Sequence, residues 1–208
     1  AMMQDRKALQ GGTSHYLGLN FAKAFDVTFQ DEKGETKYVY ATSWGVSTRL
    51  IGLLIMTHSD DKGLVIPPRL APTKVVFIPI WQDDSQIDMM RAKVADLTAG
   101  WRGRMAFKVD DREQYRPGYK FNEWEKKGVP IRIEIGPKDI ANDQVVLVRR
   151  DTNEKMVVPQ DDLLQRVEKL LMTIQQDMYN RARQFRDANT YDEDDLAAFV
   201  QRINDPGG

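Results

Sequence analysis

Residues 116–139 carry the side chains best suited to chemistry with a nucleic acid. Their carboxylates can accept hydrogen bonds from N1 and N2 of guanine, and their cations can donate to O6, N7 or phosphate. An aromatic residue such as Phe121 can stack on an unpaired base. The alternative is a salt-bridged, exposed helix at residues 123–127 with Phe121 in the core, which suits Lys126 and Lys127 well.

Two further groups of residues near the N-terminus could contact a small ligand. Residues 10–15, Gln-Gly-Gly-Thr-Ser-His, place two glycines beside hydrogen-bonding side chains, so the backbone can approach a ligand closely. Trp44 and Arg49 precede an apolar segment that we expect to be helical. An arginine at the start of a helix opposes the helix dipole, which favours an anionic partner. The alternative for residues 10–15 is a glycine turn with a histidine at the surface. The alternative for Trp44 is a position in the hydrophobic core.

Residues 7–15 and 116–139 resemble, nearly residue for residue, two segments of prolyl-tRNA synthetases of the archaeal and eukaryotic type, in the same order. Trp44-Gly45, with three residues before Arg49, resembles motif 3 of class II aminoacyl-tRNA synthetases. The resemblance spans nearly the whole chain, from Ala1 to about Asp205.

The resemblance also implies roles for individual residues. Gln10, Thr13 and Arg49 would contact ATP, with Arg49 serving catalysis by stacking on adenine or neutralising the γ-phosphate. His15 and Trp44 would line the proline pocket. The residues implied for the tRNA anticodon are Phe121, Glu125, Arg132, Lys138 and Asp139.

The reaction implied by the resemblance is the activation of L-proline with ATP and Mg²⁺, followed by transfer of proline to tRNA(Pro). The implied partners are tRNA(Pro), proline, ATP and a second copy of the full-length enzyme, in the cytoplasm and without a membrane. The chain has no cysteine, which excludes disulfides and thiolate metal sites, and we expect no metal bound by the chain itself. Motifs 1 and 2 of the class are not found before Ala1. We therefore expect a fragment that is inactive in adenylation alone.

A different class of function is also compatible with these residues. The chain could be a non-catalytic module, or a regulatory paralogue, that binds a tRNA anticodon. The ATP-type residues 10–15 and 44–49 argue against it, because a pure binding protein has no use for them. A third reading is an α/β interaction domain with no RNA partner. Residues 112–150 hold nine Lys or Arg against six Asp or Glu, a balance of +3 that only weakly favours a polyanion.

The sequence predicts that these residues are positioned by an α/β fold in three parts. Residues 1–72 resemble part of a class II antiparallel-sheet catalytic domain, and residues 187–208 the truncated start of a C-terminal domain. Between them, residues 73–186 predict a mixed α/β anticodon-binding domain with a five-stranded sheet and flanking helices.

Local patterns predict most of the elements. Strands are expected at residues 27–29, 38–40, 75–81, 105–109, 131–135, 145–148 and 156–158. Helices are expected at residues 16–25 and 87–97, at residues 123–127 with a start somewhere after Pro117, after Ser47 or Thr48, after Asp161 or Asp162, and after Asp192. A turn is expected at Gly11-Gly12. In the long helix that follows residue 162, an apolar stripe from Leu164 to Met178 is expected to face the core.

Overall fold

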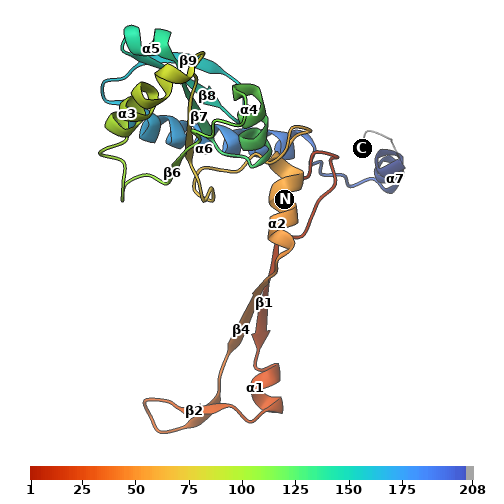
Figure 1. The fold of residues 1–208 in the computed structure, drawn as a ribbon. Coiled ribbons are helices and arrows are strands. Elements are labelled where there is room, and N and C mark those ends of the chain that lie inside the picture. The colour runs from red at the N-terminus through yellow and green to blue at the C-terminus, as the bar shows by residue number, and fades with distance from the viewer. Residues whose placement is uncertain (205–208) are drawn as a thin grey trace.

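The computed structural model describes residues 1–204 and consists of an α/β body and a long, narrow arm (Figure 1). A five-stranded sheet in the order β6-β5-β7-β8-β9 forms the body. Its strands are β5 (Val75–Pro79), β6 (Phe107–Val109), β7 (Ile131–Ile135), β8 (Gln144–Arg149) and β9 (Lys155–Pro159). The first three are parallel, and β8 and β9 are antiparallel to their neighbours. The predicted α/β class and five-stranded sheet are confirmed.

Helices cover both faces of this sheet, and β5 and β7 are therefore buried along their whole length. On one face α3 (Ile87–Leu97) and α6 (Leu163–Ala188) pack against the main core, which includes the side chains of Phe77, Ile133 and Trp101. On the other face α4 (Pro117–Lys126) buries Trp124 against Val76 and Ile78. The predicted inward stripe of α6 is confirmed, since Leu164, Val167, Leu171, Ile174 and Met178 are all buried.

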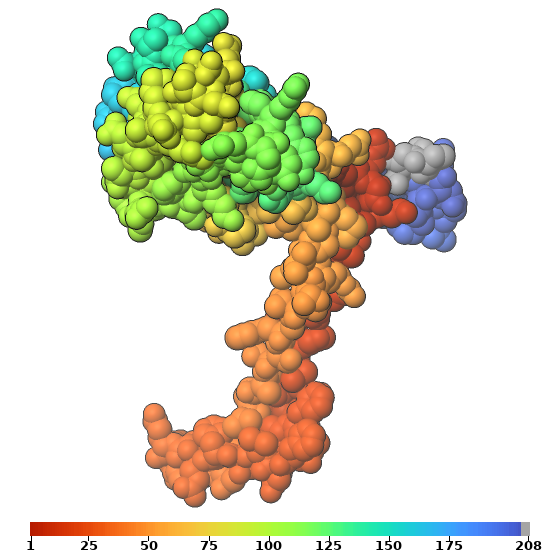
Figure 2. All heavy atoms as spheres, viewed as in Figure 1, coloured from red at the N-terminus to blue at the C-terminus, as the bar shows by residue number. Residues whose placement is uncertain are grey.

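The arm is a two-stranded antiparallel ladder of β1 (Gly12–Gly18) and β4 (Ala41–Val46). Its far end carries α1 (Asn20–Ala24) and the hairpin of β2 (Thr28–Gln30) and β3 (Thr36–Tyr38), and α2 (Arg49–His58) joins it to the body. Figure 2 shows the arm as a thin column of atoms extending from the body. Most of its apolar side chains are therefore exposed, among them Tyr16, Phe25, Tyr40 and Trp44.

Several local predictions differ from the structure in the first half of the chain. The predicted helix at residues 16–25 is wrong for its first part, because residues up to Gly18 continue β1 and only Asn20–Ala24 are helical. The turn predicted at Gly11-Gly12 is also wrong, since Gly12 already pairs with Val46 in the ladder. Apolar spacing alone did not separate the strand from the helix that follows it.

Differences in the second half of the chain concern helix starts. Helix α5 (Pro137–Ala141) was not predicted, and α4 begins at Pro117 itself, where the sequence left the start open beyond that residue. Asp162 precedes α6 in a left-handed conformation with φ of 51° and makes no side-chain cap. Helix α7 (Leu196–Asn204) is capped by Asp195 and not by Asp192, because Ala198 donates its N–H to Asp195 Oδ1 at 2.8 Å. Residues 205–208, the end of the predicted third part, lie outside the described residues.

A buried carboxylate that joins β8 to α6 predicts how stability depends on pH. The side chain of Asp151 is 1% exposed and accepts hydrogen bonds from Arg149 and Arg181. Burial alone would raise the pKa of Asp151, but these two guanidinium groups bring it below its ordinary value. A depressed pKa stabilises the fold above the unfolded-state pKa, and this contribution is lost as the pH falls through the folded-state pKa.

We therefore expect the free energy of unfolding to be nearly constant from pH 7 to about 5 and to fall below about pH 4. Urea unfolding followed by circular dichroism at each pH measures it. Asp151→Asn is the control, because this variant has nothing to protonate at that position and its curve should be flatter. An identical acid slope in both proteins would show that Asp151 is not the group responsible.

Candidate nucleic-acid interface

Helix α4 and strand β7 bring three of the five predicted anticodon residues into contact. Phe121 and Glu125 lie four residues apart on α4 and so share one face of the helix. Arg132 projects from β7 towards that face: its Nη1 donates to Glu125 Oε1 at 2.8 Å, and its guanidinium lies 4.2 Å from the centroid of the Phe121 ring. An aromatic face, a cation and a carboxylate are thus held side by side.

Glu134 completes this cluster and was missed from the sequence. It lies two residues after Arg132 on the same face of β7, and its Oε1 accepts a hydrogen bond from Arg132 Nε at 2.9 Å. Lys155 of β9 reaches Glu134 Oε2 at 3.5 Å. The Arg132 side chain is 9% exposed, so the two carboxylates fix its orientation. The alternation of Arg132 and Glu134 in a strand pattern was the sequence feature that could have revealed this pairing.

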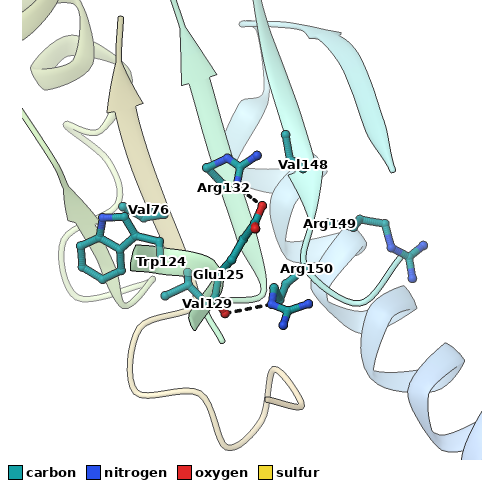
Figure 3. Close-up of a pocket in the computed structure, with 8 residues that line it drawn as sticks. All are labelled: Val76, Trp124, Glu125, Val129, Arg132, Val148, Arg149 and Arg150. Atoms are coloured by element: carbon teal, nitrogen blue, oxygen red, sulfur yellow. Dashed lines mark hydrogen bonds and ion pairs between the residues drawn. The ribbon is translucent and has the colours of Figure 1, made fainter. Parts of the chain in front are cut away.

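Arg149 and Arg150 follow at the end of β8 and have structural partners. From the sequence, these two arginines could either contact a tRNA backbone or lie at a solvent-exposed strand end. The second alternative is wrong, because the two residues are only 7% and 4% exposed. Arg149 pairs with Asp151 and Asp177. Arg150 donates from Nε to the backbone oxygen of Glu125 at 2.9 Å (Figure 3) and binds both carboxylate oxygens of Asp60.

Arg150 thereby ties the loop after α2 to the end of the helix that carries Glu125. The two backbones also touch directly, since Leu64 donates its N–H to the Lys126 oxygen at 3.1 Å. A Cβ added at Gly63 would lie 2.5 Å from the Cα of Lys126, and one at Gly128 would lie 2.7 Å from the Cβ of Leu64. Only glycine permits this approach, which fixes the position of the C-terminal end of α4.

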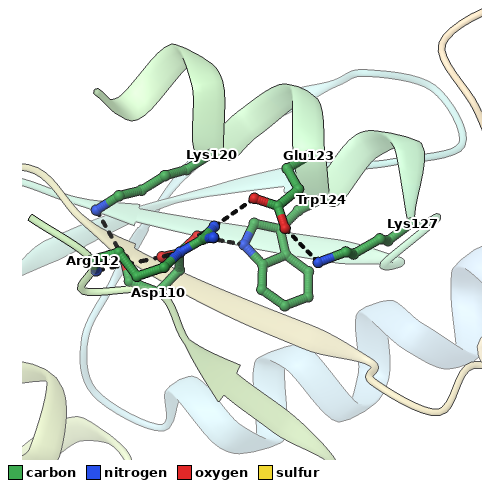
Figure 4. A network of polar contacts seen from close by, with 6 residues as sticks. All are labelled: Asp110, Arg112, Lys120, Glu123, Trp124 and Lys127. Carbon is green, nitrogen blue, oxygen red and sulfur yellow. Dashed lines mark hydrogen bonds and ion pairs between the residues drawn. The ribbon is translucent and has the colours of Figure 1, made fainter. Parts of the chain in front are cut away.

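A second polar network holds the other side of α4 (Figure 4). The Asp110 carboxylate is buried and accepts two hydrogen bonds of 2.8 Å from Arg112 and one of 2.7 Å from Nε1 of Trp124. Arg112 also donates to Glu123, which pairs with Lys127. Burial lowers the pKa of the neighbouring Lys120 ammonium, whose Nζ donates to the Asp110 backbone oxygen at 3.2 Å. The salt bridge between Glu123 and Lys127 agrees with the alternative given from the sequence, in which residues 123–127 form a salt-bridged helix.

The remaining two anticodon predictions, Lys138 and Asp139, lie on α5 and do not join the cluster around Arg132. Asp139 Oδ2 accepts the backbone N–H of Gly136 at 2.9 Å, and its Oδ1 accepts from Gln144 at 3.4 Å. This carboxylate therefore stabilises the start of α5. Lys138 is exposed beside it and is free to meet a ligand at this edge of the sheet.

The predicted ATP and proline residues lie on the arm. Gln10 donates from Nε2 to Thr13 Oγ1 at 2.9 Å, so these two are in contact. Opposite partners in the ladder share a face: Thr13 pairs with Gly45 and His15 with Ser43. Trp44 pairs with Ser14 and faces the other way.

These arm side chains are open to solvent. Trp44 is 79% exposed, and Arg49, the first residue of α2, is exposed as well. The structure places the predicted proline residues His15 and Trp44 one ladder position apart but on opposite faces. Ser43, beside His15, was not singled out from the sequence; the ladder register reveals it.

Known proteins with similar sequences show which family this chain resembles. Residues 74–170 match the family model described as an anticodon binding domain. The chain is 56% identical over 208 residues to proline–tRNA ligase of Chloroflexus aurantiacus, covering 97% of the chain and 43% of that protein. It is 51% identical to the proline–tRNA ligase of Cytophaga hutchinsonii and 50% identical to that of Natranaerobius thermophilus, with 100% of the chain and 43% of each relative covered. The chain belongs to the prolyl-tRNA synthetase family.

Within this prolyl-tRNA synthetase chain, the matched anticodon-binding region contains all five predicted anticodon residues, and the predicted ATP and proline residues precede it. The chain spans less than half the length of the relatives named above. Among residues 1–204, we find no group of three or more His, Asp or Glu side chains arranged to hold a metal ion. Within the same residues, no helix is both long and apolar enough to cross a membrane.

Proposed function

We propose that this chain serves a proline–tRNA ligase by reading the anticodon of tRNA(Pro). The observation that carries the proposal is the cluster of Phe121, Glu125 and Arg132, in which the Arg132 guanidinium is fixed between two carboxylates and over an aromatic ring. Unpaired anticodon bases expose their faces and edges, which these groups can stack on and hydrogen-bond. Proline anticodons share two guanines, and guanine presents both donors and acceptors.

Each side chain has a task in this proposal. Phe121 stacks on a base, and Glu125 accepts from guanine N1 and N2 through its oxygen that Arg132 leaves free. Arg132 orients Glu125 and donates to guanine O6 or N7. Lys138 contacts a base or phosphate from α5. Asp139 supports it by holding the start of that helix, and it also presents a carboxylate to the RNA.

In this proposal, residues 1–72 are part of the catalytic domain and residues 73–186 form the anticodon-binding domain. Residues 187–208 are the start of a C-terminal domain. Gln10, Thr13 and Arg49 bind ATP, and the charge of Arg49 offsets negative charge on the phosphates. His15 and Trp44 contact proline, the enzyme acts as a homodimer, and the reaction takes place in the cytoplasm. The described residues offer no carboxylate cluster for Mg²⁺, so no step through that ion is assigned to this chain.

The proposal is tested by offering the purified chain a total tRNA pool at fixed salt and sequencing the tRNAs that it retains. We expect strong enrichment of proline isoacceptors, all of which carry the two anticodon guanines. Retention in proportion to abundance would contradict the proposed function. A chain with Phe121→Ala and Arg132→Ala is the control, and it should lose the enrichment.

The exposed position of Lys138 on α5 predicts that it contributes to tRNA binding at the periphery of the proposed anticodon interface. Because the side chain is exposed, replacing it by alanine should weaken tRNA(Pro) binding by about 1 kcal/mol without lowering the melting temperature. Binding is measured by fluorescence anisotropy at two salt concentrations. Lys126→Ala, an exposed lysine left out of the site, is the matched control. Equal affinities for the wild type and Lys138→Ala would remove Lys138 from the interface.

A further inference from the structure

A cavity lies at the carboxyl ends of two neighbouring parallel strands, at the opposite end of α4 from Glu125. Strand β5 continues into α3 on one face of the sheet, and β6 continues into α4 on the other face. Adjacent parallel strands whose connections leave towards opposite faces open a crevice between them, where open α/β sheets bind ligands. Here the crevice is a cavity of about 420 Å³, within the range of small-molecule sites.

Aromatic and cationic side chains line this cavity together. Trp81, just after β5, is half-buried, and the Lys120 ammonium lies 4.7 Å from the centroid of its ring. Tyr115 stacks on Tyr119 with centroids 4.4 Å apart, and the guanidinium of Arg112 lies 4.7 Å from the Tyr115 ring. Flat aromatic faces beside cations are the combination that binds bases together with their phosphates.

Arg116 is the cation best placed to meet a ligand in this cavity. It lines the cavity just before α4 and is exposed. Within residues 1–204 its guanidinium forms neither a hydrogen bond nor an ion pair, in contrast to Arg112 and Arg132. A guanidinium without a protein partner keeps its full capacity to bind phosphate in a bidentate manner. Polar groups that could meet a base edge complete the lining: Gln82, Asp84, Glu113 and Gln114.

We propose that this cavity binds one nucleotide, with the base against Trp81 and the phosphate on Arg116. The inference rests on the proposed function, because α4 links the two places: Arg116 and Glu125 are nine residues apart, about 14 Å along the helix. That span suits a single RNA strand that places anticodon bases at Glu125 and Arg132 and a flanking nucleotide of the loop at Trp81. A free mononucleotide has the same chemistry.

The test follows the indole N–H signals of the ¹⁵N-labelled chain, with Trp81 assigned by the Trp81→Phe variant. The probes are a tRNA(Pro) anticodon stem-loop, the same stem-loop with both guanines replaced, and GMP. We expect the stem-loop to shift the Trp81 signal. Arg116→Gln should weaken stem-loop binding about 10-fold and reduce its salt dependence by roughly one phosphate contact. The cost of replacing the guanines should be unchanged in this variant.

The control is Arg102→Gln, which removes an exposed arginine from the loop before β6, at the end of the strands opposite to the cavity. It should bind the stem-loop like the wild type. A Trp81 shift with GMP but not with the stem-loop would assign the cavity to a free nucleotide. If the stem-loop binds and its guanines are discriminated while Trp81 and Arg116→Gln show no effect, the cavity proposal is wrong and the proposed function stands. No stem-loop binding would instead contradict the proposed function.

Discussion

Replacing Asp110 by alanine should lower the free energy of unfolding by about 2–4 kcal/mol. The Asp110 carboxylate is buried and receives hydrogen bonds from Arg112 and from the Trp124 indole. Without it, the Trp124 N–H stays buried without an acceptor, and Arg112 keeps only Glu123. The loss is at the lower end of values for buried ion pairs because Arg112 is 35% exposed. Urea unfolding at pH 7 measures it.

Asp111→Ala is the matched control for this experiment. Asp111 is the next residue, but it is partly exposed and pairs with Arg91 at the surface, so its removal should cost less than about 1 kcal/mol. If Asp110→Ala unfolds the chain completely, Asp110→Asn keeps the shape and should give an intermediate loss. Equal stability of the Asp110 and Asp111 variants would show that the network does not hold α4 in place.

Glu125→Gln should weaken binding of the tRNA(Pro) anticodon stem-loop by about 2 kcal/mol, a loss of roughly 30-fold. The substitution keeps the size of the side chain and leaves one oxygen that can accept from Arg132. It removes the negative charge that we expect to pair with guanine N1 and N2. The variant should bind a stem-loop with both guanines replaced about as well as the wild type does.

Glu123→Gln is the control for the Glu125 variant, because both residues lie on α4. Glu123 pairs with Arg112 and Lys127, away from the cluster at Arg132. It should therefore leave the difference between the two stem-loops unchanged. Titration by fluorescence anisotropy gives both affinities. A Glu125→Gln protein that still separates the stem-loops as the wild type does would remove Glu125 from the reading of guanine.

The fold of the body was largely predictable because its elements are long or uniformly apolar. Helix α3 and strand β7 begin and end at the expected residues, and α6 buries the expected stripe. Helix α5 escaped prediction because it has only five residues, too few for a periodic pattern. Residues 16–18 belong to β1 although a helix was predicted there, because Leu17 fits the helical spacing of the apolar residues that follow it.

The candidate site was predictable in part. Helical spacing puts Phe121 and Glu125 on one face, but only the fold shows that Arg132 and Glu134 meet that face from β7. Local sequence could not show that Asp139 is engaged at the start of α5, since this depends on the backbone turn at Gly136. Nor could it show the register of β1 and β4, which directs His15 and Trp44 to opposite faces.

The most direct test of anticodon reading is fluorescence anisotropy of this chain with two stem-loops at one stated salt concentration. One stem-loop carries the proline anticodon, and the other has both of its guanines replaced. We predict that the first binds at least 10-fold more tightly, and that Arg132→Ala abolishes the difference. Equal affinity of the wild-type chain for both stem-loops would contradict base reading by the cluster of Phe121, Glu125 and Arg132.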